Sequence, residues 1–97
     1  MSIGVIVEFQ LKPEGIAILI EEMKTRLPST REWNGCNYVY LQADHDDPNH
    51  LYLVERWDSR EQYDQYREWA MAQPGTAKMM EHATREMKTL YLDDTGA

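Results

Sequence analysis

The chain has very little cysteine, no long apolar run and few positive charges. Its 97 residues include a single cysteine, Cys36, which excludes an internal disulfide and a cysteine metal cluster within one chain. No stretch approaches the roughly 18 apolar residues that a membrane-spanning helix needs. Lys and Arg number 10 against 17 Asp and Glu, so the net charge is −7. An acidic chain without a basic cluster is a poor partner for nucleic acid or for an anionic membrane surface.

The residues that are present are typical of one small globular domain over residues 1–97. Hydrophobic residues make up 42% and charged residues 28% of the chain, which is an ordinary balance for a folded domain. Met1 and Ser2 lead directly into a strand-like segment without the basic region of a secretory leader, so we expect a cytoplasmic protein. A domain of this size buries only about 60–65% of its unfolded surface, so a partner chain would add stability.

The hydrophobic pattern predicts four strands and two main helices. Strands are expected over residues 3–11, 36–43, 51–57 and 87–92. A first helix is expected from Pro13 toward Trp33, kinked or restarted at Pro28. Ser59 and Gln62 form a capping box for a second helix, and a short helix over 77–83 follows the break at Pro74-Gly75. The order is β-α-β-β-α-β, an α+β ferredoxin-like fold with an antiparallel four-stranded sheet and its helices on one face.

The second and third strands are apolar on both faces. Tyr38-Val39-Tyr40-Leu41 and Leu51-Tyr52-Leu53-Val54 leave no clearly polar side. Two helices cover only one face of such a sheet, and the chain has no residues left to cover the other. The pattern therefore predicts a homodimer in which two sheets face each other. The alternative is a monomer with partly exposed aromatic residues, which tyrosine tolerates.

Three segments together resemble the antibiotic biosynthesis monooxygenase family. They are the run REWNGCNY over residues 31–38, then Leu41 and Asp44, and the run ERWDSRE over residues 55–61. The resemblance implies a ferredoxin-like fold whose sheets pair into a dimeric α+β barrel. It also implies a cofactor-independent oxygenase acting on quinols, anthrones or related polyketide aromatics, although the family includes isomerases and members without known activity. Trp57 and Tyr63 match positions that line the substrate cavity in some members.

One position departs from the family pattern. The family often has a histidine nine residues after the tryptophan, and here that position is Tyr66. A phenol with an ordinary pKa of about 10 is a poor general base at neutral pH, although it donates hydrogen bonds well. The resemblance therefore predicts the fold more firmly than the chemistry.

Oxygen chemistry without a cofactor needs an electron-rich substrate in a mostly apolar pocket. We expect the walls of that pocket to come from the second helix and its junction, namely Trp57, Tyr63, Tyr66 and Trp69. The catalytic candidates are His82, by its intrinsic pKa, and Tyr66. Asn37 could orient a substrate oxygen. The alternatives are plain core packing for the aromatic residues and a surface position for His82.

No cofactor or metal is expected. The chain has no glycine-rich phosphate loop, and the loop His45-Asp46-Asp47 with His50 is interpreted as a solvated turn rather than a metal site. Haem-degrading relatives carry an asparagine and a tryptophan where this chain has Phe9 and Tyr66, so haem degradation is a less favoured alternative. Besides an oxygenase acting on a small aromatic ligand, a non-catalytic ligand-binding or accessory protein and an isomerase stay open.

Overall fold

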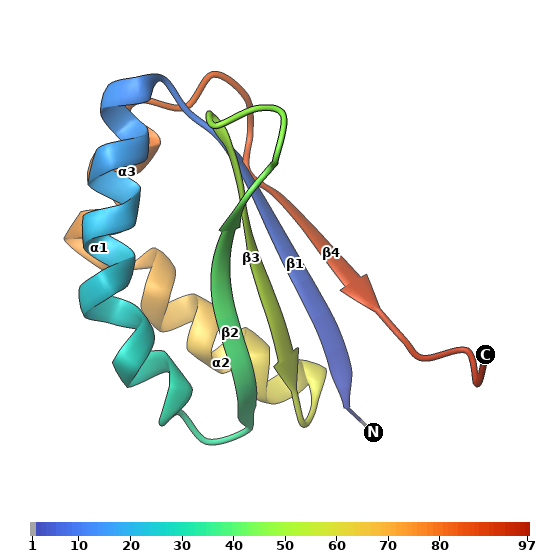
Figure 1. The fold of residues 1–97 in the computed structure, drawn as a ribbon. Helices are drawn as coiled ribbons and strands as arrows, with labels where there is room; N and C mark the ends of the chain where they lie inside the picture. Colours follow the sequence, from blue (N-terminus) through green and yellow to red (C-terminus); the bar gives the residue numbers. More distant parts are fainter. Residues whose placement is uncertain (1) are drawn as a thin grey trace.

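The computed structural model describes residues 2–97 and contains one four-stranded sheet and three helices (Figure 1). In chain order the elements are β1 (Ile3–Gln10), α1 (Pro13–Arg31), β2 (Cys36–Ala43), β3 (His50–Trp57), α2 (Arg60–Met71), α3 (Pro74–Met80) and β4 (Lys88–Leu92). The sheet order is β2-β3-β1-β4, with every neighbouring pair antiparallel. All three helices lie on one face of the sheet. The predicted ferredoxin-like α+β fold is confirmed.

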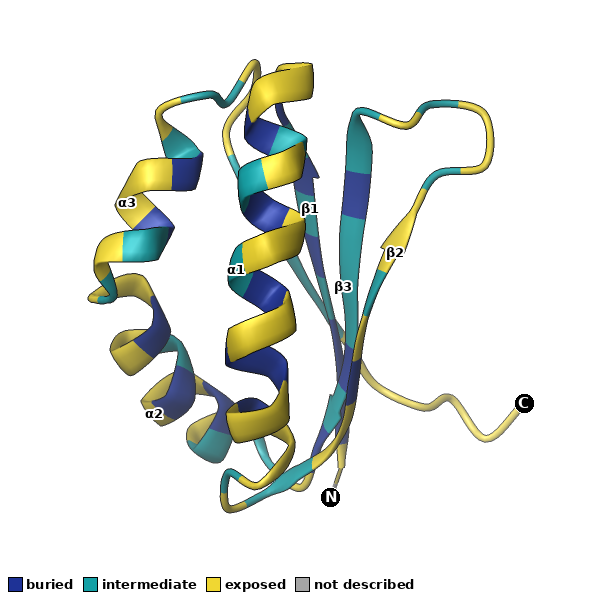
Figure 2. Cartoon of the chain, turned by 60° about the vertical axis from the view of Figure 1, so that its left-hand side comes forward, coloured by how far each residue is buried: buried dark blue, intermediate teal, exposed yellow. Residues whose placement is uncertain are grey.

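α1 differs from its prediction at Pro28 and at its end. The helix continues through Pro28 as one element and ends at Arg31, two residues before Trp33. Pro28 is on the exposed side of the helix, where water can bind the Lys24 carbonyl that loses its N–H partner. The inward stripe of α1 is buried against the sheet (Figure 2). Gly35 then turns the chain into β2 with a φ of 98°, a conformation that suits glycine.

The Ser59 cap of α2 is confirmed, although Gln62 Oε1 accepts from the Ser59 hydroxyl instead of completing the box, and the next helix is shifted. The Ser59 hydroxyl accepts a hydrogen bond from the Gln62 backbone N–H at 3.2 Å. α3 begins at Pro74, which fits the first turn of a helix, and it ends at Met80 rather than near residue 83. The prediction that placed His82 within this helix was therefore wrong, because His82 lies in the turn beyond it.

The core lies between the helices and one face of the sheet. It includes the inward residues of β1, the inner stripe of α1, and Tyr63 and Tyr66 of α2. Trp69 was expected in the same stripe, but its side chain is 37% exposed. Within residues 2–97, no helix is both long and apolar enough to cross a membrane.

The opposite face of the sheet carries an apolar row. Tyr40 pairs with Val54, Val54 with Ile6, and Ile6 with Leu90, so one row of side chains crosses all four strands. Tyr40 is 54% exposed and stacks on Tyr38 with ring centroids 5.9 Å apart. Figure 2 shows that none of the helices lies over this face. The face without helices therefore carries one uncovered apolar row, with charged residues such as Arg56 and Glu8 beside it.

Candidate functional site

A small, mostly apolar cavity of about 40 Å³ lies between the inner face of the sheet and the helices. Four of its lining residues are methionines, Met23, Met71, Met79 and Met87. Polar and charged residues from three helices and one strand also reach it. They are Arg26, Glu55, Tyr63, Tyr66, Arg67 and Thr76. Charged groups rarely enter an apolar interior without a partner or a function, so this cavity is the candidate active site.

Glu55 is the only carboxyl group among the residues that line this cavity. It occupies an inward position of β3 between Leu53 and Trp57, and only 3% of its surface is exposed. The Trp57 indole N–H donates a hydrogen bond to Glu55 Oε1 at 3.0 Å. Burial raises the pKa of Glu55 to about 7, although the Trp57 hydrogen bond and the positive charge of Arg67 oppose that rise. Near neutral pH this carboxyl group can therefore either accept or donate a proton.

Arg67 and Tyr63 supply hydrogen-bond donors beside the carboxyl group. They are one turn apart on α2, and Arg67 Nη1 donates to the Tyr63 hydroxyl at 3.2 Å and to Thr89 Oγ1 at 2.6 Å. Burial raises the pKa of Tyr63, and the nearby Glu55 carboxylate raises it further. Tyr63 therefore stays protonated at neutral pH, and the pair can stabilise negative charge on a bound oxygen.

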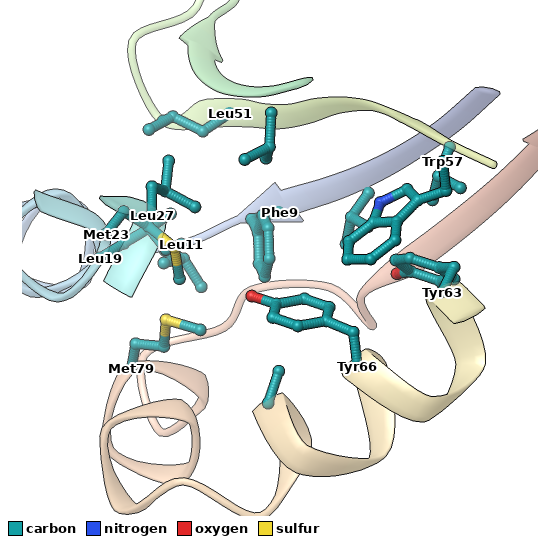
Figure 3. Packing of buried hydrophobic residues seen from close by; sticks show 14 of the residues in the cluster. Phe9, Leu11, Leu19, Met23, Leu27, Leu51, Trp57, Tyr63, Tyr66 and Met79 are labelled. Carbon is teal, nitrogen blue, oxygen red and sulfur yellow. The ribbon is translucent and has the colours of Figure 1, made fainter. Parts of the chain in front are cut away.

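Tyr66 extends from α2 into the core beneath Phe9 (Figure 3). Its hydroxyl lies 2.7 Å from Thr30 Oγ1 of α1, and either oxygen can be the donor. Burial raises the pKa of Tyr66, and the Thr30 hydrogen bond only partly opposes the rise. A phenol held in this way is a hydrogen-bond donor and not a base at neutral pH.

The two tryptophans expected as walls lie outside the lining of the cavity. Trp57 is fully buried behind it, edge-on to Tyr63 with centroids 5.6 Å apart and tilted against Tyr66 at 5.1 Å. Trp69 is partly exposed on α2, where its ring packs against Trp33 at 5.3 Å and against Tyr66 at 5.9 Å. Of the four expected aromatic residues, the cavity therefore brings together Tyr63 and Tyr66.

Asn37 and His82 also lie away from the lining residues. Asn37 is exposed on β2, and its amide donates to Asp58 Oδ1 at 2.8 Å. The His82 carbonyl accepts a hydrogen bond from the Lys12 backbone N–H at 2.9 Å. The His82 Cβ packs so closely on Gly15 that a side chain there would collide with it. These contacts give His82 a structural role, because they hold the turn after α3 against the start of α1.

Neither the single thiol nor the hairpin loop forms a second reactive site. Burial raises the pKa of Cys36 to about 11, so its thiol stays protonated at neutral pH. In the loop, the Asp44 and Asp47 carboxylates accept backbone N–H groups two residues ahead and so brace the turn. Among residues 2–97, no three His, Cys, Asp or Glu side chains gather so that they could hold a metal ion.

Three charged residues of the cavity were not predicted from the sequence, namely Arg26, Glu55 and Arg67. Glu55 belongs to the run that resembles the family, but no role followed from that likeness. A signal was available, because Leu51, Leu53, Glu55 and Trp57 alternate on one strand. A carboxyl group within such a series must face the core. For Arg26 the signal was helical spacing, because it lies three residues after Met23 and four before Thr30 on the buried stripe of α1, although its charge argued for an outward position.

Comparisons with known proteins agree with this architecture. The family model for antibiotic biosynthesis monooxygenases matches residues 2–76. Among solved structures, Rv0793 from Mycobacterium tuberculosis superposes with a TM-score of 0.78 at 24% identity, covering 97% of this chain and 95% of that one.

Two further structures are similar at lower identity. A conserved protein from Methanosarcina mazei Go1 has a TM-score of 0.79 at 19% identity, covering 95% of this chain and 91% of that chain. A protein of unknown function from Bacteroides thetaiotaomicron has a TM-score of 0.73 at 17% identity, covering 94% and 95% respectively. These structures support the fold, and a search of curated proteins gave no significant match. The extent of the family match shows that the chain belongs to the antibiotic biosynthesis monooxygenase family.

Proposed function

We propose that this protein is a cofactor-independent monooxygenase that acts on an electron-rich aromatic substrate, such as a quinol or an anthrone. The observation that carries the proposal is Glu55, a buried carboxyl group with a pKa of about 7 inside an apolar cavity. A base with this pKa is suited to proton transfer at physiological pH. Membership of the monooxygenase family supports the same reaction class.

The first step in this proposal is removal of a proton from the substrate. The Glu55 carboxylate accepts a proton from a phenol, or from the acidic CH₂ group of an anthrone. The Arg67 guanidinium and the Tyr63 hydroxyl, 3.2 Å apart, then stabilise the negative charge on the substrate oxygen. The resulting anion is electron-rich enough to pass one electron to O₂.

The following steps need no external reductant. Superoxide and the substrate radical combine at a ring carbon, and the peroxide that forms loses water. For an anthrone, the CH₂ group loses two hydrogens and gains one oxygen as a carbonyl. The second oxygen atom leaves in water, so O₂ supplies the whole oxidation. The chain's own residues move protons and stabilise charge.

The cavity must expand before it can hold such a substrate. A volume of about 40 Å³ accommodates a water molecule, whereas benzene needs roughly 150 Å³. Four methionines line the cavity, and unbranched thioether side chains change rotamer easily. Their mobility supports a site that opens around a flat ligand.

The decisive assay measures turnover of a panel of quinols and anthrones under ¹⁸O₂ and under nitrogen, each against a control without protein. We expect protein-dependent turnover that requires oxygen and places one ¹⁸O atom in the product. Equal rates with and without protein would favour the ligand-binding or accessory alternative. Turnover that persists under nitrogen would instead indicate an isomerase.

We also propose that the active form is a homodimer joined through the exposed sheet face. The apolar row of Tyr40, Val54, Ile6 and Leu90 supports this, because burial against a second copy would remove its apolar surface from water. Light scattering at micromolar concentration is expected to give about twice 11.4 kDa. Tyr40→Glu should shift the protein toward the monomer.

The matched control for this prediction is Thr25→Glu, which adds the same charge on the exposed side of α1. It should leave the mass unchanged. A monomeric wild type, or dimers that persist in the Tyr40→Glu variant, would contradict the proposed interface.

A further inference from the structure

Arg26 separates the interior cavity from a cleft on the surface. The cleft, of about 210 Å³, lies beside α1 and the junction of α2 with α3, where Glu22, Trp69 and Gly75 contribute to its walls. Among the described residues, Arg26 is the one that lines both the cleft and the interior cavity. A ligand that occupied the two spaces together would therefore lie directly against its guanidinium group.

The guanidinium group of Arg26 is buried but has few partners. Only 6% of the side chain is exposed. Nη2 donates one hydrogen bond to Thr76 Oγ1 at 2.9 Å, and it lies 3.8 Å from Glu22 Oε2, beyond hydrogen-bond distance. A guanidinium carries five N–H groups, so Arg26 has donor capacity left for an oxyanion.

The ion-pair partner of Arg26 is itself held in place. The Glu22 carboxylate rests on Gly75 at the start of α3, where there is no room for a side chain. The Thr76 hydroxyl donates in turn to the Ala70 carbonyl at 2.6 Å. These contacts fix the surroundings of Arg26 while its own charge stays only partly compensated.

The charge balance of the cavity favours an anion. Arg26 and Arg67 bring two positive charges to the cavity lining, against the single carboxyl group of Glu55. Glu22, on the cleft side, lies 3.8 Å from Arg26 and offsets part of its charge. The rest of the lining is largely apolar, which suits a flat ring. Guanidinium groups bind carboxylates with planar, paired hydrogen bonds.

We propose that Arg26 binds a carboxylate on the substrate, so that the natural ligand is an acidic aromatic that reaches the cavity through the cleft between α1 and the junction of α2 with α3. The aromatic ring lies among the methionines near Glu55, and the carboxylate lies at the boundary that Arg26 forms. This proposal rests on the proposed function, since it places the substrate in the same cavity.

The test compares binding of two probes that differ by one carboxylate, 1-hydroxy-2-naphthoate and 1-naphthol. Titration calorimetry under nitrogen measures both affinities without any turnover. The wild type is expected to bind the acid at least about tenfold more tightly than the phenol. Arg26→Gln should remove that preference and change the affinity for 1-naphthol by less than about twofold.

Two variants serve as controls. Arg26→Lys keeps the charge and should retain part of the preference for the acid. Lys24→Gln removes the same charge from an exposed site on the same helix, and it should change neither affinity. If Arg26→Gln does not fold, the wild-type preference and its reduction in Arg26→Lys still decide the question.

Equal wild-type affinity for the two probes, or equal weakening of both by Arg26→Gln, would overturn the proposal. A wild type that binds neither of the two probes would overturn it as well. Because no oxygen is consumed, the result is independent of the monooxygenase assay. Selective acid binding without turnover would uphold the role of Arg26 and reject the proposed reaction.

Discussion

Glu55→Gln is expected to lower turnover by about 10²- to 10⁴-fold, the usual contribution of a general base. The amide keeps the size of the carboxyl group and can still accept the Trp57 hydrogen bond, but it cannot take a proton from the substrate. Steady-state oxygen consumption with a quinol or anthrone measures the effect. Affinity for a redox-inert aromatic should change little.

Two comparison variants sharpen this test. Glu61→Gln alters an exposed carboxyl group in the first turn of α2 and should leave turnover unchanged. His82→Ala tests the base that the sequence favoured, and we expect turnover to survive because His82 lies outside the cavity lining. Loss of activity in His82→Ala together with an active Glu55→Gln would reverse the assignment of the base.

The pH dependence follows from the same carboxyl group. Only ionised Glu55 accepts a proton, so kcat/KM should rise with pH through about 7 and then level off. Glu55→Gln should lose this rise. The folded pKa lies above the ordinary value of 4.5, so folding favours the protonated form. Glu55 therefore lowers stability as pH rises from about 4.5 to 7, by on the order of 3 kcal/mol.

Trp57→Ala should have the largest effect on stability. Trp57 is fully buried and packs against both Tyr63 and Tyr66. Truncation leaves a large void and removes the indole donor from Glu55, at a cost of about 3–5 kcal/mol. Small domains have a total stability of only about 5–15 kcal/mol. Chemical denaturation should therefore show a variant that is barely folded or largely unfolded.

Trp57→Phe separates packing from electrostatics. Phenylalanine keeps much of the ring but has no N–H group, and the Trp57 hydrogen bond opposes the rise that burial causes in the pKa of Glu55. The pH at which kcat/KM levels off should therefore move upward. Trp69→Phe, at an exposed position, should leave the profile unchanged. An unshifted profile in Trp57→Phe would show that the indole does not tune the carboxyl group.

The fold was predictable from the sequence because its signals are local. Alternation in residues 3–11 matched β1, and Ser59 with Gln62 marked the start of α2. The candidate site was harder to predict from the sequence. Helical spacing indicated Tyr63 and Tyr66 but also suggested Trp69, since periodicity does not show where a stripe leaves the core. The pairing of Arg67 with Thr89 joins residues 22 positions apart, and that contact requires the sheet order.

The methionines that line the cavity have a chemical consequence of their own. Thioethers are readily converted to sulfoxides by peroxides, and in the proposed reaction a peroxide forms within reach of Met23, Met71, Met79 and Met87. Each sulfoxide would replace a pliable apolar wall with a polar one. The feature that lets the cavity adapt to its ligand would then also limit how many catalytic cycles one molecule completes.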